Sequence, residues 1–172
     1  SVRAVLVDVR NGRELGSAVS VYKHGVMDRV LAGRKLPFDF ALQHPQDYLN
    51  GLATATAQAL RIARTKPNQI VGIGVDFTAC TVLPTDAQGE PLCLKKAFAN
   101  EPHAYVKLWK HHAAQPQADR TNATARARNE PFLRHYGAGV SCEWLVPKAL
   151  ETLERAPAVF AAAKRFLEAA DR

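Results

Sequence analysis

Residues 69–84 constrain the fold of this chain more than any other segment. A short run of β-branched residues and glycines, 70–75, stops at Asp76 and gives way to a turn of small and hydroxyl-bearing residues, 78–81. The run is too short for a core helix, so it predicts a strand over 70–77 that is covered on both faces, as in α/β sheets. Ligands in such sheets gather beyond the carboxyl end of a strand. A strand followed by an Asp and Thr turn that binds nothing is the alternative.

The sequence also gives clear predictions for the segments before this strand. A β-hairpin opens the chain, with strands at 3–9 and 15–23 joined through Asn11 and Gly12, a strong hairpin signal. An amphipathic helix over 45–64 follows, because apolar residues recur there at helical spacing and a proline suits its first position. The predicted order is therefore β, β, α, β.

Other parts of the chain carry weaker signals. Residues 24–43 have few apolar anchors and predict a long connection. Around Trp109 both a short strand and a helical face fit the pattern, and local sequence leaves the two open. The sequence predicts a second hairpin or turn over residues 82–94. It also predicts three helices, over residues 114–129, 143–154 and 158–164. Gly137 and Gly139 indicate a flexible turn between the first two of these helices.

Composition excludes several classes of protein. The 172 residues are 47% apolar and 23% charged, which is typical of a soluble globular domain. No apolar run approaches the roughly 20 residues that span a bilayer, and no leader is visible. The net charge of +7 is scattered, so solvated surface is favoured over a nucleic-acid face. Three widely spaced cysteines indicate neither a disulfide framework nor a zinc site, and a reducing cytoplasm fits.

Few residues carry recognisable chemistry by themselves. The Gly72 and Gly74 pair lies within the predicted strand rather than at a strand-to-helix turn, which disfavours Walker-type NTPases and Rossmann dehydrogenases. His111 and His112 are adjacent and point to different faces, and the other histidines are isolated, so no metal site is predicted. Asp76, at the end of the predicted strand, is the best candidate for a carboxylate in a magnesium-phosphate site. Trp109 has lysines on either side, and it is equally consistent with a sugar or phosphoester platform and with core.

Four segments together carry a family resemblance. Residues 73–84, 41–49, 102–114 and 141–150 resemble ribulokinases, which are FGGY carbohydrate kinases. The Asp-Phe-Thr-Ala-Cys-Thr and Lys-Leu-Trp-Lys-His-His blocks are specific to ribulokinases. The resemblance implies an α/β fold: a partial actin-like, ribonuclease-H-like ATPase domain with an antiparallel hairpin followed by alternating helices and strands. It also implies a short strand before Trp109, with the next helix starting around Ala114.

The resemblance further implies where the sugar binds and what is missing. Ala79, Trp109 and the turn residues Thr78 and Thr81 are expected to line the sugar site, with polar contacts from Lys107, Lys110 and His111. Residues 1–172 are expected to be part of an amino-terminal domain. We expect the first strand with its phosphate loop to be cut away, and the catalytic aspartate and the ATP domain to lie beyond Arg172. No catalytic residue is therefore assigned within the chain.

The implied activity is ATP- and Mg²⁺-dependent phosphorylation of L-ribulose to L-ribulose 5-phosphate in the cytoplasm, in arabinose breakdown. The isolated fragment is expected to be inactive. The expected partners are the sugar and ATP, and neither nucleic acid nor a membrane is expected. Two alternatives stay open: a kinase for another pentulose, and a non-catalytic basic binding module. A homo-oligomer is also left open.

Overall fold

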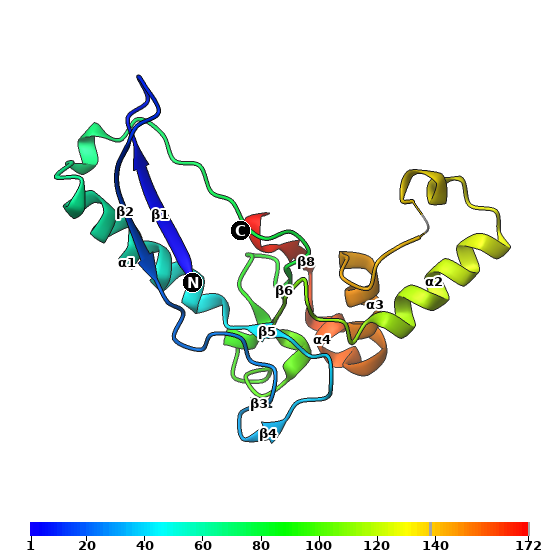
Figure 1. Ribbon diagram of the computed structural model, residues 1–172. Coiled ribbons are helices and arrows are strands. Elements are labelled where there is room, and N and C mark those ends of the chain that lie inside the picture. Colours follow the sequence, from blue (N-terminus) through cyan, green and yellow to red (C-terminus); the bar gives the residue numbers. More distant parts are fainter. Residues whose placement is uncertain (138, 172) are drawn as a thin grey trace. The chain divides into compact units, whose positions relative to one another are not determined.

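The computed structural model describes residues 1–137 and 139–171, and the chain divides into two compact units (Figure 1). We call Ser1–Gly25 with His44–Val75 the hairpin unit, and Val26–Gln43 with Asp76–Arg172 the four-strand unit. Each is described by itself.

The hairpin unit consists of two strands and one helix. Strands β1 (Val2–Val7) and β2 (Glu14–Ser20) pair antiparallel, and helix α1 (Pro45–Ile62) packs on them. The helix approaches the hairpin closely at Gly16, where an added Cβ would lie 3.0 Å from the backbone nitrogen of Ala63 and 3.1 Å from the carbonyl oxygen of Ala59. The predicted hairpin and the predicted helix over 45–64 are both confirmed.

A small antiparallel sheet organises the four-strand unit. Its strand order is β5 (Leu42–Gln43), β7 (Val106–Lys107), β6 (Val82–Thr85) and β8 (Arg165–Glu168). A separate two-stranded ribbon pairs β3 (Val30–Leu31) with β4 (Arg34–Lys35). The helices of this unit are α2 (Gln115–Ala127), α3 (Leu145–Arg155) and α4 (Pro157–Ala162).

Most helix predictions in this unit are confirmed, and the short strand expected before Trp109 is β7. The second hairpin is only partly right. Strand β6 forms as expected, but its partners are β7 and β8. Residues Leu92–Leu94 form a 3₁₀ turn, and a single bridge joins Thr85 to Pro91. For the predicted turn at Gly137 and Gly139, the intervening residue 138 lies outside the described residues.

The apolar core of the four-strand unit draws heavily on residues 26–43, although the sequence predicts a long connection with few apolar anchors over 24–43. Leu31, Leu36, Phe40 and Leu42 are at most 7% exposed and belong to the same buried cluster as Tyr105, which precedes β7, and Val159 of α4. Their irregular spacing matches neither a helical nor a strand period, which is why the pattern did not reveal them. This part of the prediction was wrong.

The predicted buried strand over 70–77 is also wrong. In the part of the chain that the structure describes, this segment is extended but belongs to no strand, and Val71, Ile73 and Val75 are 81%, 84% and 59% exposed. Nothing lies within 4 Å of a Cβ added at Gly72 or at Gly74, so no other described part of the chain packs closely against these two positions. Sequence encodes the tendency to extend, whereas a strand also requires a neighbouring backbone to satisfy its hydrogen bonds.

Candidate functional site

The two segments that the sequence assigned to the sugar site emerge at the same edge of the four-strand unit. Strands β6 and β7 run antiparallel with Val82 opposite Lys107. The turn 78–81, which precedes Val82, therefore leaves the sheet on the same side as Trp109, which follows β7. The structure thus brings Ala79 and Trp109 into neighbouring positions, although some thirty residues separate them in the sequence.

A buried lysine of helix α3 joins these two segments directly. The Lys148 side chain is fully buried, and its Nζ donates one hydrogen bond to the carbonyl of Cys80 and another to the carbonyl of Leu108, each at 2.6 Å. Cys80 follows Ala79 and Leu108 precedes Trp109. Because one ammonium donates to both carbonyls, the oxygen atoms of Cys80 and Leu108 lie no farther apart than the sum of the two hydrogen-bond lengths. This holds the two chain segments close together.

The predicted site residues divide into an accessible and a buried group. Trp109 is 46% exposed, and Thr78, Ala79 and Lys110 are exposed as well. We call these four residues the candidate sugar surface. They offer an aromatic face, a hydroxyl, a cation and a small methyl side chain. That combination suits a polar ligand with an apolar carbon skeleton.

Thr81 is buried and shapes the turn rather than facing outward. Its hydroxyl donates to the carbonyl of Thr78 at 2.6 Å, and its backbone N–H donates to the Glu168 carboxylate of β8 at 2.7 Å. These bonds close the turn on itself and anchor it to the neighbouring strand. The predicted role of Thr81 as a sugar contact stays a prediction, and the described contacts give it a supporting role.

Lys107 and His111 are also inside the protein, where both contact Glu151 of α3. Lys107 Nζ lies 2.7 Å from Glu151 Oε2 and 2.7 Å from Thr152 Oγ1, and His111 Nε2 lies 3.0 Å from the same Glu151 oxygen. The exposed fractions of these side chains are 2% for Lys107 and 0% for both His111 and Glu151. Direct sugar contacts from Lys107 and His111 stay predictions. In this structure both residues support the end of β7.

The pKa shifts of Glu151 and His111 agree with the hydrogen bonds that these two side chains make. Burial opposes the charged form of Glu151, but the hydrogen bond from His111 and the positive charge of Lys107 outweigh it and lower the pKa of this carboxyl from 4.5 to about 2. Burial lowers the pKa of His111. The backbone N–H of Ala41 donates to His111 Nδ1 at 3.3 Å, so Nδ1 carries the lone pair and Nε2 carries the proton that reaches Glu151. His111 is therefore a neutral imidazole in a fixed tautomer.

Sequence reasoning missed Lys148 and Glu151, which carry this arrangement. The helix was predicted correctly, but its buried face is the polar one, whereas Val146 and Leu153 are 59% and 42% exposed. A signal was present: Lys148, Glu151 and Thr152 recur at spacings of three and four, which place them on one side of a helix. Their charge made them look solvent-exposed.

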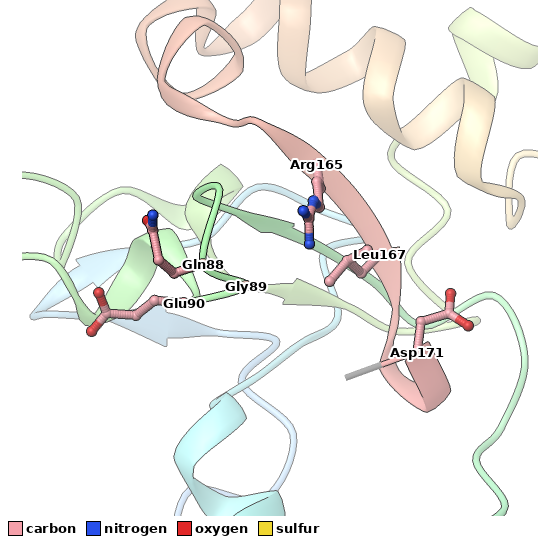
Figure 2. A pocket seen from close by; sticks show the side chains of 6 residues that line it. All are labelled: Gln88, Gly89, Glu90, Arg165, Leu167 and Asp171. Atoms are coloured by element: carbon pink, nitrogen blue, oxygen red, sulfur yellow. The ribbon is translucent and has the colours of Figure 1, made fainter.

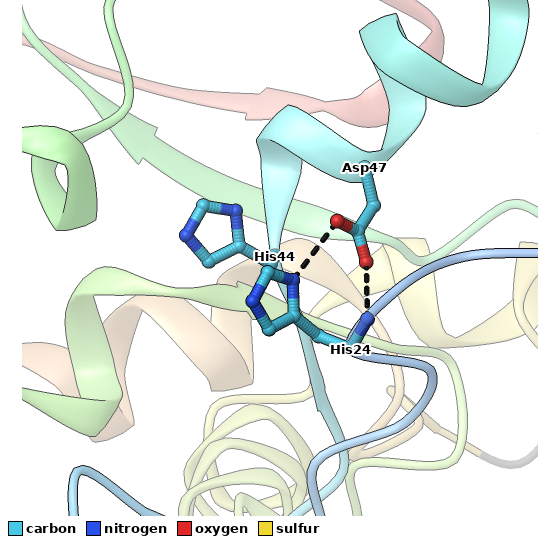
Figure 3. A group of neighbouring side chains, drawn as sticks. All are labelled: His24, His44 and Asp47. Atoms are coloured by element: carbon cyan, nitrogen blue, oxygen red, sulfur yellow. Dashed lines mark hydrogen bonds and ion pairs between the residues drawn. The ribbon is translucent and has the colours of Figure 1, made fainter. Parts of the chain in front are cut away.

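A second group of polar side chains lies in the hairpin unit, where His24, His44 and Asp47 gather at the start of α1 (Figure 3). The Asp47 carboxylate accepts from the His24 backbone N–H at 2.8 Å and lies 2.9 Å from His24 Nδ1. The two imidazole rings are stacked at 4.6 Å with an interplanar angle of 23°. The prediction that His24 and His44 are isolated is therefore wrong.

The stacking of the two imidazole rings determines whether His24, His44 and Asp47 can bind a metal ion. A ring nitrogen directs its lone pair within the plane of the ring, so two nearly parallel stacked rings cannot both point at one ion. One of them would have to rotate before a metal could bind. As the structure stands, His44 caps α1 by accepting from the Gln46 N–H, and Asp47 places a negative charge near the positive end of the helix.

An open cavity of about 390 Å³ lies elsewhere in the four-strand unit, between the turn at Gln88–Glu90 and strand β8 (Figure 2). Its lining residues are Gln88, Gly89, Glu90, Arg165, Leu167 and Asp171. None of the predicted sugar-site residues lines this cavity. The candidate sugar surface is therefore a separate feature, formed at the edge of the sheet.

Comparisons with known proteins agree with the sequence resemblance. The chain is 56% identical to a ribulokinase of Bacillus licheniformis and 49% identical to ribulokinases of Geobacillus thermodenitrificans and Mycolicibacterium smegmatis, in each case over 99% of the chain. It spans only about 31% of the length of these relatives. No family model matches the chain.

The fold comparison agrees with the expected fold class. A crystal structure of a xyloylose kinase from Brucella ovis matches 98% of this chain and 30% of its own, with a TM-score of 0.73 at 18% identity. This likeness confirms the sugar-kinase fold of the actin-like ATPase class, with its opening hairpin and its mixture of helices and strands. Among the described residues, no helix is both long and apolar enough to cross a membrane.

Proposed function

We propose, from the premise that this chain is a segment of a ribulokinase, that the protein containing it transfers a phosphoryl group from ATP to the terminal 5-hydroxyl of L-ribulose. The identity to ribulokinases over nearly the whole chain supports the reaction class. Within this protein, the chain provides one wall of the sugar site. The reaction belongs to arabinose breakdown, and the cytoplasm is its proposed location.

The observation that carries this proposal is the half-exposed Trp109 beside the turn at Ala79. An indole face packs well against the carbon-bound hydrogens of a sugar, and the methyl side chain of Ala79 lets a ligand approach the backbone of the turn. Phosphoryl transfer depends on positioning and on charge neutralisation more than on covalent chemistry by the protein. The chain's contribution is to hold the acceptor hydroxyl in place.

The kinase relationship implies that ATP is used and that a divalent cation accompanies it. The candidate sugar surface does not fit a magnesium nucleotide, because Thr78, Ala79, Trp109 and Lys110 include no carboxylate to hold the metal. We therefore place the base, Mg²⁺ and most nucleotide contacts in parts of the enzyme outside these residues. The 172-residue chain by itself should show no ribulose-dependent ATP hydrolysis, and measurable turnover would contradict the assignment.

The test of the sugar site is kinetic. In the complete enzyme, Trp109→Ala should raise the KM for L-ribulose about tenfold, which corresponds to about 1.4 kcal/mol of lost contact. The KM for ATP should stay unchanged. Tyr136→Ala is the control, because this aromatic residue is 52% exposed in the same unit and is not part of the candidate sugar surface. An unchanged KM for ribulose in Trp109→Ala would remove this residue from the site.

The two alternatives have distinct signatures. A kinase for another pentulose would show its highest kcat/KM with a sugar other than L-ribulose, so a panel of pentuloses separates it from the main proposal. A basic binding module would form a salt-sensitive complex with duplex DNA or RNA. We expect no such complex at low salt, since the positive charge is scattered along the chain.

A further inference from the structure

We infer that Lys148 is a positioning residue for substrate binding, which fixes the Ala79 turn and the Trp109 segment as one rigid surface. This inference rests on the proposed function, because the surface in question is the candidate sugar surface. Lys148 does not itself belong to that surface: it is fully buried and acts through the carbonyls of Cys80 and Leu108.

The partners of Lys148 are unusual for a buried cation. Among the described residues, no carboxylate lies within ion-pair distance of its Nζ, and its hydrogen bonds go to two backbone carbonyls. Removing an ammonium from water without an adjacent counter-ion is unfavourable, and burial lowers the pKa of Lys148 to about 8. A methionine would fill the same space without this cost. The burial of a lysine at this position is therefore better explained by a need for its two hydrogen bonds than by a need to fill space.

The sheet joins the two segments held by Lys148 to each other only weakly. Both residues of strand β7 pair with β5, but the ladder between β6 and β7 consists of the single pair Val82 and Lys107. Cys80 has a φ of 63°, in the left-handed region that is disfavoured for a residue with a side chain. A turn in this conformation needs fixed partners, and the bond from Lys148 to the Cys80 carbonyl supplies one.

The backbone of α3 is held in turn at the position of Lys148. Both the Lys107 ammonium, at 3.1 Å, and the Thr152 hydroxyl, at 2.9 Å, donate to the Lys148 carbonyl. Lys107 is itself bound to Glu151. The buried network therefore fixes the helix from which Lys148 reaches the sugar surface, and this explains why Lys107 and Glu151 are buried beside it.

The experiment compares Lys148→Met, Lys148→Arg and Val159→Ala in the complete enzyme. Lys148→Met keeps the length of the side chain but removes its donors, and it should raise the KM for L-ribulose at least tenfold while the KM for ATP stays within twofold of wild type. Lys148→Arg keeps a cationic donor and should recover part of this loss. Val159→Ala truncates a buried residue of the same unit that makes none of the hydrogen bonds of Lys148, so it should lower stability without changing the KM for ribulose.

A second readout does not depend on the substrate. In a Trp144→Phe background, Trp109 is the one remaining tryptophan of this chain, and any tryptophan elsewhere in the enzyme is replaced by phenylalanine. Acrylamide should quench its fluorescence at least twofold more efficiently once Lys148→Met releases the segment. Lys148→Arg should recover part of the wild-type protection. If Lys148→Met does not fold, Lys148→Arg provides the test: its quenching and its KM for ribulose should both exceed the wild-type values, and wild-type values of both would overturn the positioning role.

The outcomes separate the two proposals. If the wild-type enzyme does not phosphorylate L-ribulose, the proposed function fails, and the quenching comparison alone then decides whether Lys148 fixes the surface. If the enzyme is active, an unchanged KM for ribulose in Lys148→Met overturns the positioning role. A rise in KM in Val159→Ala equal to that in Lys148→Met also overturns it, because general destabilisation would then account for the effect.

Discussion

The buried Glu151 carboxylate offers the sharpest test of how the four-strand unit is stabilised. Its pKa falls from 4.5 in the unfolded chain to about 2, which corresponds to about 3 kcal/mol at ~1.4 kcal/mol per pKa unit. Breaking a buried ion pair by removing one partner independently costs about 3–5 kcal/mol. We therefore expect Glu151→Gln, which removes the charge and keeps the shape, to lower the free energy of unfolding by about 3 kcal/mol.

The chain provides a specific optical probe for this measurement. Both tryptophans, Trp109 and Trp144, belong to the four-strand unit, so their fluorescence during urea unfolding reports that unit alone. With a urea dependence of about 2 kcal/mol per molar, the transition midpoint should fall by roughly 1.5 M. Glu154→Gln is the matched control. Glu154 lies on the same helix and pairs with Arg120 at the surface, so Glu154→Gln should change stability far less than Glu151→Gln does.

A double-mutant cycle tests the cause of the loss. Because Lys107 would be left as a buried unpaired cation, Lys107→Met should restore part of the stability that Glu151→Gln removes. Strict additivity of the two substitutions would refute the ion-pair explanation. So would a midpoint for Glu151→Gln that coincides with that of Glu154→Gln.

Two further predictions concern pH and close packing. Burial, assisted by the positive charge of Lys107, lowers the pKa of His103 from 6.5 to about 4. The unfolded chain therefore takes up this proton first as the pH falls, so the contribution of His103 to stability should be constant above pH 6.5 and decrease by up to about 3 kcal/mol between pH 6.5 and 4. Urea unfolding at a series of pH values measures this slope, which should flatten in His103→Phe; an equal slope in the variant would assign it to other groups. In the hairpin unit, Gly16→Ala should cost about 1–3 kcal/mol, because the new Cβ meets the backbone of α1 at 3.0–3.1 Å. Circular dichroism during thermal unfolding measures this loss against Gly72→Ala, whose Cβ meets nothing within 4 Å, and equal transitions in the two variants would contradict the close approach.

Local sequence determined the elements whose formation depends on near neighbours. The hairpin at β1 and β2 follows from β-branched strands joined at Asn11 and Gly12, and α1 follows from the proline at its start and its apolar spacing. The same holds for α2, which begins at Gln115 as the resemblance implied. The resemblance also indicated Ala79 and Trp109, which the structure brings to the same edge of one sheet.

Only the tertiary structure decided which polar groups lie inside and which segments find partners. The sequence predicts no role for Lys148 or Glu151, because their partners come from Cys80, Leu108, Lys107 and His111, which the sequence places far from α3. The run at 70–77 showed the reverse, since a clear strand pattern remained exposed among the described residues. The physical reason is common to both. Periodicity reports what a segment prefers, whereas burial of a charge or completion of a strand depends on hydrogen-bond partners supplied from elsewhere in the chain.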